Sequence, residues 1–138
     1  MTTQLKAGVA ATEISPPEGI GLGGYPHHER HNTGIHDPLM ASCLYLHDGT
    51  THIAIVCTDL LLYSKKEIRK VRDAAAQKTA IPADNIMITT SHSHSAPRTA
   101  GRLDLEGLES GAQPSTDYLA NVRSKLAGII EQAYNDAF

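Results

Sequence analysis

Residues 52–90 carry a strand–helix–strand pattern that constrains the fold of this 138-residue chain more than any other feature. The run 53–57 is apolar at every position, which is typical of a central strand covered on both faces. A second apolar run at 85–90 follows the helical segment and predicts another strand. Strand, helix and strand in this order predict a βαβ unit, whose two strands end at the same edge of the sheet.

The helix between these strands has clear start and stop signals. Ser64 and Glu67 have the spacing of a capping box, with serine at the N-cap and glutamate at N3. Pro82 cannot continue the helix, which we expect to end near residue 79.

Further elements flank this unit on both sides. A short strand is expected at 5–14, and the runs 39–46 and 52–58 are joined through Asp48-Gly49, a strong hairpin signal. Ser115 or Thr116 is expected to cap a final helix of about 19 residues with one apolar stripe. The sequence therefore predicts an α/β fold: a mixed sheet with a β-hairpin, a βαβ unit and a C-terminal packing helix.

Two loop regions complete the chain. Glycines are frequent at 19–24, but no helical pattern follows them, so this stretch is not a dinucleotide-binding motif. Residues 97–115 form a long polar segment of the kind that serves as a functional lid or is simply mobile.

Composition excludes several classes of function. The net charge is −3 with no basic stripe, so nucleic-acid binding is not expected. No apolar run approaches the roughly 20 residues of a membrane span, and the N-terminus lacks a secretory signal, so we expect a cytoplasmic protein. Cys43 and Cys57 make no disulfide framework and are expected to be small buried hydrophobic residues.

His92 and His94 follow the predicted strand 85–90 with i, i+2 spacing. On a strand such positions share one face, so both imidazoles would project together and form part of a metal site. Zinc needs three or four ligands, and the other candidates are His36, Asp37, Asp59 and the loop histidines. The alternative is that both are ordinary hydrogen-bonded histidines. The chain contains no GxSxG, P-loop, CxxC or HExxH motif.

Several segments together resemble the amino-terminal portion of the neutral ceramidase family. The matching segments run in the family's order and are residues 7–15, 24–25, 33–42, 58–60 and 85–97. The last segment is the most specific, because it resembles the family's HTHSGP signature. The resemblance implies that residues 1–138 are the amino-terminal portion of a ceramidase-like catalytic domain, within a larger α/β domain.

The resemblance also implies a mechanism, in which a zinc-dependent amidase hydrolyses a carbon–nitrogen bond. His92 matches the signature histidine that binds zinc, and His94 matches the histidine that faces the reacting amide. His36 matches a second histidine near the site, with a catalytic role. Asp59 matches an aspartate at the end of a strand, which could orient a zinc ligand without itself binding the metal.

Departures from the family pattern point away from ceramide as the substrate. Ala96 replaces the glycine of the signature, and Arg98 follows Pro97 where glycine is expected. An arginine can bind a carboxylate, so we expect a small-molecule amide or ester substrate, with Arg98 in substrate binding.

The family's remaining zinc ligands have no counterparts in these 138 residues. We therefore expect a downstream segment or a companion chain to supply them, in an oligomer. Two alternatives stay open: an autoproteolytically processed hydrolase with its nucleophile on a companion chain, and a non-catalytic metal-binding domain.

Overall fold

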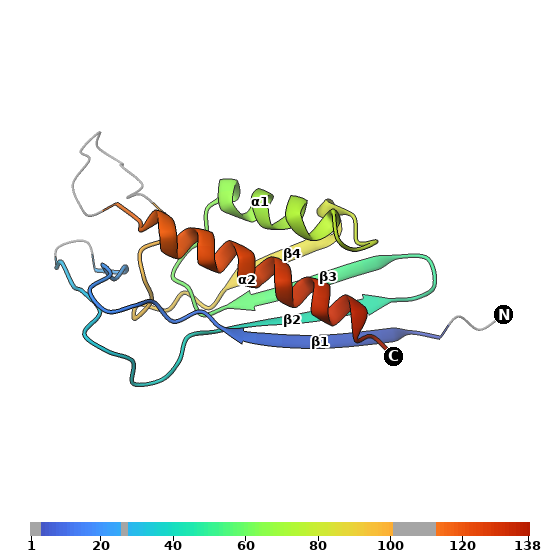
Figure 1. Ribbon diagram of the computed structural model, residues 1–138, viewed down its shortest axis with the longest axis horizontal. Coiled ribbons are helices and arrows are strands. Elements are labelled where there is room, and N and C mark those ends of the chain that lie inside the picture. Colours follow the sequence, from blue (N-terminus) through green and yellow to red (C-terminus); the bar gives the residue numbers. More distant parts are fainter. Residues whose placement is uncertain (1–3, 26–27, 101–112) are drawn as a thin grey trace.

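The computed structural model describes residues 4–25, 28–100 and 113–138, and it shows two helices packed on a four-stranded sheet (Figure 1). The strands are β1 (Lys6–Glu13), β2 (Met40–His47), β3 (His52–Thr58) and β4 (Ile86–Thr90). The helices are α1 (Lys65–Ala76), the 3₁₀ helix η1 (Ala83–Asn85) and α2 (Thr116–Asn135).

The sheet has the strand order β1-β2-β3-β4 and mixes both kinds of pairing. β2 pairs with β1 and with β3 in antiparallel fashion, whereas β3 and β4 are parallel and are connected through α1. The predicted α/β class is therefore confirmed: the sheet contains the β2–β3 hairpin and the β3–α1–β4 unit, and α2 packs on it.

The hairpin turn follows its local sequence. The Asp48 carboxylate accepts hydrogen bonds from the backbone N–H groups of Thr50 and Thr51, at 2.9 and 2.7 Å. Gly49 adopts a φ of +94°, which favours glycine because it has no Cβ. β3 spans the predicted residues 52–58, and this turn fixes where the strand starts.

The start of α1 realises half of the predicted capping box. The Ser64 hydroxyl accepts a hydrogen bond from the Glu67 N–H at 3.3 Å, as expected. The Glu67 carboxylate does not reach back to Ser64, because it binds Lys70 and Arg123 at 2.7 Å each. α1 ends at Ala76 and not near residue 79 as expected. The Thr79 hydroxyl donates a hydrogen bond to the carbonyl of Ala75.

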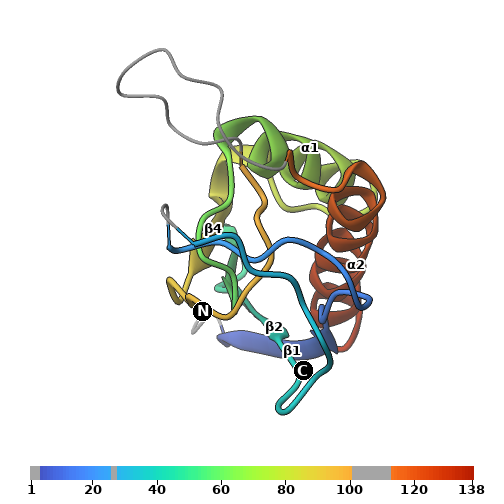
Figure 2. The ribbon, with the colours of Figure 1, turned by 90° about the vertical axis from the view of Figure 1, so that its left-hand side faces the viewer.

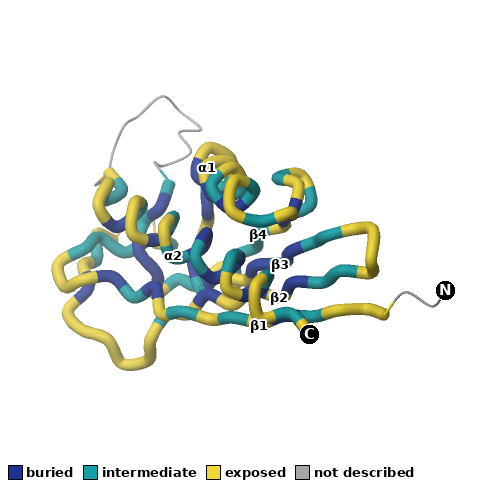
Figure 3. The backbone as a smooth tube through the Cα atoms, turned by 45° about the vertical axis from the view of Figure 1, so that its right-hand side comes forward, coloured by how far each residue is buried: buried dark blue, intermediate teal, exposed yellow. Residues whose placement is uncertain are grey.

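α2 packs closely across β1 and β2 and against α1. A Cβ at Gly8 would overlap the carbonyl oxygen of Ala133, so glycine is needed for this close approach. The buried Tyr118 hydroxyl donates to the carbonyl of Ile14 at 2.6 Å, which ties the helix start to the end of β1. Buried residues gather between the helices and the sheet, whereas β1 carries exposed and half-buried positions (Figure 3).

Both helices lie on the same side of the sheet (Figure 2). The expectation that β3 is covered on both faces is therefore wrong within the described residues, since Ile55 is half-buried and Cys57 is exposed on the other face. The prediction of two buried cysteines holds for Cys43 alone, whose pKa burial raises to about 12. The sequence of β3 is thus apolar on both faces, although the described residues cover only one of those faces with helices.

Neither α1 nor α2 is long and apolar enough to cross a membrane, and the same holds for every other helix in the described residues.

Glu67 offers a test of how α1 and α2 are held together. Burial raises the pKa of Glu67, but hydrogen bonds from Lys70 and Arg123 outweigh it and lower the pKa below the ordinary value of 4.5. We expect Glu67→Gln to reduce the free energy of unfolding near pH 7 by about 1–3 kcal/mol. Because the folded-state pKa is lowered, this contribution is present above pH 4.5 and is lost as pH falls through the folded-state pKa.

Urea unfolding of both proteins across this pH range measures the difference. Glu131→Gln is the matched control, since it breaks the more exposed Lys78–Glu131 pair, 3.0 Å long, which joins α2 to the residues just after α1. An equal effect of both substitutions at pH 7 would contradict the role given to Glu67.

Candidate active site

The loop after β4 continues the contact between β3 and β4 beyond the end of the sheet. Ser91 N–H donates to the carbonyl of Thr58 at 2.9 Å, and Ser93 N–H donates to that of Leu60 at 3.2 Å. The predicted juxtaposition of Asp59 with the end of β4 is therefore found. The histidines themselves lie beyond the strand, which ends at Thr90, so their arrangement comes from the loop and not from a strand pleat.

His92 and His94 nevertheless lie in contact, with ring centroids 5.1 Å apart and an interplanar angle of 75°. The backbone of His92 adopts a φ of +61°, an uncommon conformation for a residue with a side chain. Such strained residues cluster at functional sites, where the surrounding structure holds them.

The His92 ring is oriented by a backbone carbonyl. Its Nδ1 lies 3.0 Å from the carbonyl oxygen of Leu61. A carbonyl oxygen only accepts, so Nδ1 carries the proton in this hydrogen bond and the lone pair of the neutral ring lies on Nε2. Metal-binding histidines commonly donate their other N–H to a carbonyl or carboxylate in this way. Sequence reasoning gave this orienting role to Asp59 and missed Leu61.

His94 is held by two residues that follow the glycine-rich stretch, Tyr25 and Arg30. Tyr25 meets the His94 ring edge-on with centroids 5.3 Å apart. The Arg30 guanidinium lies 4.3 Å from the centre of the Tyr25 ring and donates to the backbone carbonyls of His94 and Gly23, at 2.5 and 2.7 Å. Neither Tyr25 nor Arg30 was assigned a role from sequence.

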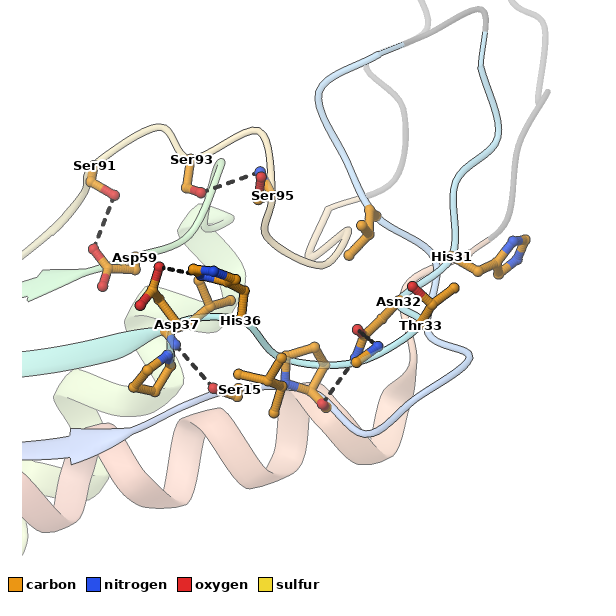
Figure 4. A pocket seen from close by; sticks show the side chains of 16 residues that line it. Ser15, His31, Asn32, Thr33, His36, Asp37, Asp59, Ser91, Ser93 and Ser95 are labelled. Carbon is orange, nitrogen blue, oxygen red and sulfur yellow. Dashed lines mark hydrogen bonds and ion pairs between the residues drawn. The ribbon is translucent and has the colours of Figure 1, made fainter.

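A polar pocket of about 530 Å³ opens beside this loop (Figure 4). Ser91, Ser93 and Ser95 line it, whereas His92 and His94 are not among the lining residues. The remaining side chains come from residue 15 to the start of β2 and from the end of β3: Ser15, Pro16, Leu22, His31, Asn32, Thr33, Gly34, Ile35, His36, Asp37, Pro38, Leu39 and Asp59.

Asp59 and His36 both lie in this pocket with their own partners. The Asp59 carboxylate accepts hydrogen bonds from the Met40 N–H at 2.9 Å and from the Ser91 hydroxyl at 3.2 Å. His36 Nδ1 lies 2.8 Å from Asp37 Oδ2, and both side chains are almost fully exposed, at 98% and 88%. The structure therefore brings His36, Asp37 and Asp59 into one pocket, and His92 and His94 into a separate ring pair.

Arg98 occupies the strand-like segment that closes the loop. Its backbone N–H donates to the carbonyl of Gly21 at 3.0 Å, next to the bridge between Leu22 and Pro97. Arg98 is half-buried and does not line the polar pocket. Its role in substrate binding stays a prediction.

The side chains of the described residues supply only part of what a metal ion needs. Within residues 4–25, 28–100 and 113–138, no group of three or more histidine, cysteine, aspartate or glutamate side chains could hold one. His92 fits as a single ligand because its Nε2 carries a lone pair on an exposed ring. A tetrahedral zinc site would need further donors in addition to those described.

Comparisons with known proteins place the fold. No family model matches the chain, and no curated protein matches it. Its fold is similar to that of neutral ceramidase from Pseudomonas aeruginosa, with a TM-score of 0.80 at 20% identity, covering 96% of this chain and 22% of that chain. It is also similar to a ceramidase complexed with C2, with a TM-score of 0.75 at 20% identity, covering 96% of this chain and 21% of that one.

The chain therefore spans about a fifth of the length of these ceramidase structures. The prediction of a ceramidase-like fold within a larger α/β domain is confirmed at the level of architecture.

Gly24 provides a test of how His94 is positioned. Gly24 has a φ of +97°, and a Cβ there would lie 2.6 Å from His94 Nδ1. We expect Gly24→Ala to displace the His94 ring and to shift its imidazole resonances in long-range ¹H–¹⁵N spectra. Gly19→Ala is the matched control, because Gly19 has a φ of +84° but nothing within 4 Å of its added Cβ. Unchanged His94 resonances in Gly24→Ala would contradict the packing.

Proposed function

We propose that this chain carries part of the active site of a zinc-dependent hydrolase that cleaves a small-molecule amide or ester. Residues 1–138 would be the amino-terminal portion of a ceramidase-like catalytic domain. Two findings support this: the fold is shared with ceramidases, and His92 has the orientation of a metal ligand. The His92 geometry carries the proposal, because an ordinary exposed histidine needs neither a strained backbone nor a fixed tautomer.

In this mechanism His92 would hold zinc through Nε2, while the Leu61 carbonyl keeps the ring in place and fixes its tautomer. Zinc, when bound, supplies Lewis-acid polarisation of a carbonyl and lowers the pKa of water to about 7. Because the His92 proton is already on Nδ1, metal binding at Nε2 would need no change of tautomer.

His94 would contact the reacting group of the substrate. Its ring meets that of His92 at 5.1 Å, so a group held near His92 would lie within reach of His94. The ring could donate a hydrogen bond to the oxygen on which negative charge develops. The contacts of Tyr25 and Arg30 with this residue would keep the donor aligned.

His36 would transfer a proton from the polar pocket. Its Nδ1 faces Asp37 Oδ2 at 2.8 Å, and this carboxylate partner would orient the ring. Asp59 would position the loop through its hydrogen bond with Ser91, which is next to His92 in the chain. It would in this way help to orient the zinc ligand without binding the metal itself.

The substrate class we propose is a small polar amide and not ceramide. Hydroxyl, imidazole and carboxylate groups are among those that line the pocket beside the loop, and the chain has five tyrosines, one phenylalanine and no tryptophan. Arg98 would bind a carboxylate of the substrate. The remaining zinc ligands would come from a downstream segment or companion chain within an oligomer, and we propose a cytoplasmic location.

Metal content tests the proposal. We expect about one zinc per assembly by elemental mass spectrometry of the intact protein, and its loss in His92→Ala. His94→Ala and His36→Ala are expected to keep zinc but to lower kcat/KM on N-acyl substrates by about 10²–10⁴-fold. His47→Ala, at the far end of the hairpin, is the matched control for removal of a histidine.

An assembly without metal, or one in which His92→Ala retains zinc, would overturn the zinc role. Hydrolysis that persists in chelator would instead favour a nucleophile on a companion chain. Zinc without hydrolysis of any N-acyl or ester substrate would favour a non-catalytic metal-binding domain.

A further inference from the structure

The end of the β2–β3 hairpin carries a row of three basic side chains across the sheet. His47 of β2 is paired with His52 of β3 on one side and with Lys6 of β1 on the other. Side chains of directly opposite residues lie on the same face of a sheet, close enough to interact. The row lies at the opposite end of β3 from Asp59 and the candidate site, so the proposed mechanism does not use it.

The two imidazole rings of this row are stacked face to face. The ring centroids of His47 and His52 are 3.9 Å apart, and the ring planes differ by 10°. Two neutral rings can stack in this way, whereas two charged rings repel each other across so short a distance. Like charges at directly opposite positions destabilise an antiparallel pair, and the Lys6 ammonium group adds a further positive charge to the row.

The same rings connect the hairpin to the last turn of α2. The hydroxyl of the buried Tyr45 lies 2.7 Å from His52 Nδ1. The Tyr134 ring of α2 meets the Tyr45 ring at a centroid distance of 5.3 Å and lies 6.2 Å from the His52 ring. The C-terminal end of α2 therefore packs against the same end of the sheet as the hairpin turn (Figure 1).

The residues that follow α2 are tied to β1 beside this row. The Phe138 N–H donates to the Ala7 carbonyl, and the Ala7 N–H donates to the Phe138 carbonyl, at 3.2 Å each. Ala7 follows Lys6 directly in β1. Any movement of Tyr134 away from the histidine pair would therefore also disturb these two hydrogen bonds.

We propose that the His47–His52 pair, together with Tyr45 and Tyr134, is a pH-sensitive latch that holds the last turn of α2 on the sheet. The latch is closed when both imidazoles are neutral. When both take up a proton, the row carries three positive charges, the stacked rings separate, and the end of α2 loosens from β1 and β2. This latch goes beyond the proposed hydrolase function and does not depend on it.

Titratable groups surround His52 from β1, β2, the hairpin turn and α2: Lys6, Tyr45, His47, Asp48 and Tyr134. Burial and then the charge of His47 lower the pKa of His52 below its ordinary 6.5, while the Asp48 carboxylate raises it to a smaller extent. Burial raises the pKa of Tyr45 above its ordinary 10, so that hydroxyl stays protonated near neutral pH. From η1, the neutral side-chain amide of Asn85 donates to the His52 carbonyl at 2.9 Å.

The sign of the pH response follows from this shift. Because the pKa of His52 is lower in the folded protein than its ordinary value, the opened state takes up the proton first. The closed latch is therefore fully stable above pH 6.5, and its stability is lost as pH falls below 6.5 and through the folded-state pKa.

Hydrogen exchange at about pH 7.5 and about pH 5 tests the latch. We expect the protection factor of the Ala7 amide, referred to the intrinsic exchange rate at each pH, to fall by at least about fivefold at the lower pH. The ring resonances of Tyr134 are expected to shift over the same range. The amide of Val56, a buried residue in the middle of β3, is expected to keep its protection because the opening is local.

Two variants assign the response to the row of basic side chains. His47→Phe keeps a ring for the stack but carries no charge, so we expect the fall at Ala7 to shrink to less than about twofold and the pKa of His52 to rise. Lys6→Gln removes an exposed charge from the same row and is expected to weaken the response while the protein still folds. Lys65→Gln, at an exposed lysine in the first turn of α1, is the matched control.

Equal protection of Ala7 at both pH values would overturn the proposal, and so would a loss of protection that is unchanged in His47→Phe and Lys6→Gln. An equal loss at Val56 would show unfolding of the whole sheet and would also overturn it. None of these measurements depends on zinc content or hydrolysis, so failure of the latch and failure of the proposed hydrolase function are distinguishable.

Discussion

The parallel pairing of β3 with β4 is the constraint on which the candidate site depends. It sets residues 58–61 beside residues 90–93, and the hydrogen bonds continue past the end of the sheet to Ser91 and Ser93. Because of this register, the Leu61 carbonyl faces His92 and the Asp59 carboxylate faces Ser91. The site therefore depends directly on the packing that holds the sheet together.

Much of the fold could be predicted because its signals are local. The Asp48-Gly49 turn, the Ser64 cap and the Ser115 cap each act within four residues, and the hairpin and both helices were found from them. The Glu67 side chain was misassigned because its partner Arg123 is 56 residues away. The spacing of residues along the chain carries no information about such a distant contact. It predicted the Ser64 cap correctly but could not show which residues the Glu67 carboxylate binds.

The candidate site was less predictable for the same reason. His92 and His94 were found together, but through a strand pleat that the structure replaces with a loop and a positive φ. The contact between Arg30 and His94 joins residues 64 positions apart, and the partner of His92 is a backbone carbonyl, which no residue type reveals. His36 and Asp59 both line the polar pocket, which His92 and His94 do not line, and the roles predicted for them stay predictions.

Two independent features of the chain point to the same missing structure. His92 has a fixed ring orientation, although no group of three or more histidine, cysteine, aspartate or glutamate side chains in the described residues could hold a metal ion. The sheet has one face buried by helices and another that is apolar and open. A strained histidine is costly and an exposed apolar sheet face invites aggregation, so neither is expected in a unit that functions alone. Both features fit a unit that is one part of a larger body, as the similar fold is in the ceramidase structures, of which this chain spans about a fifth.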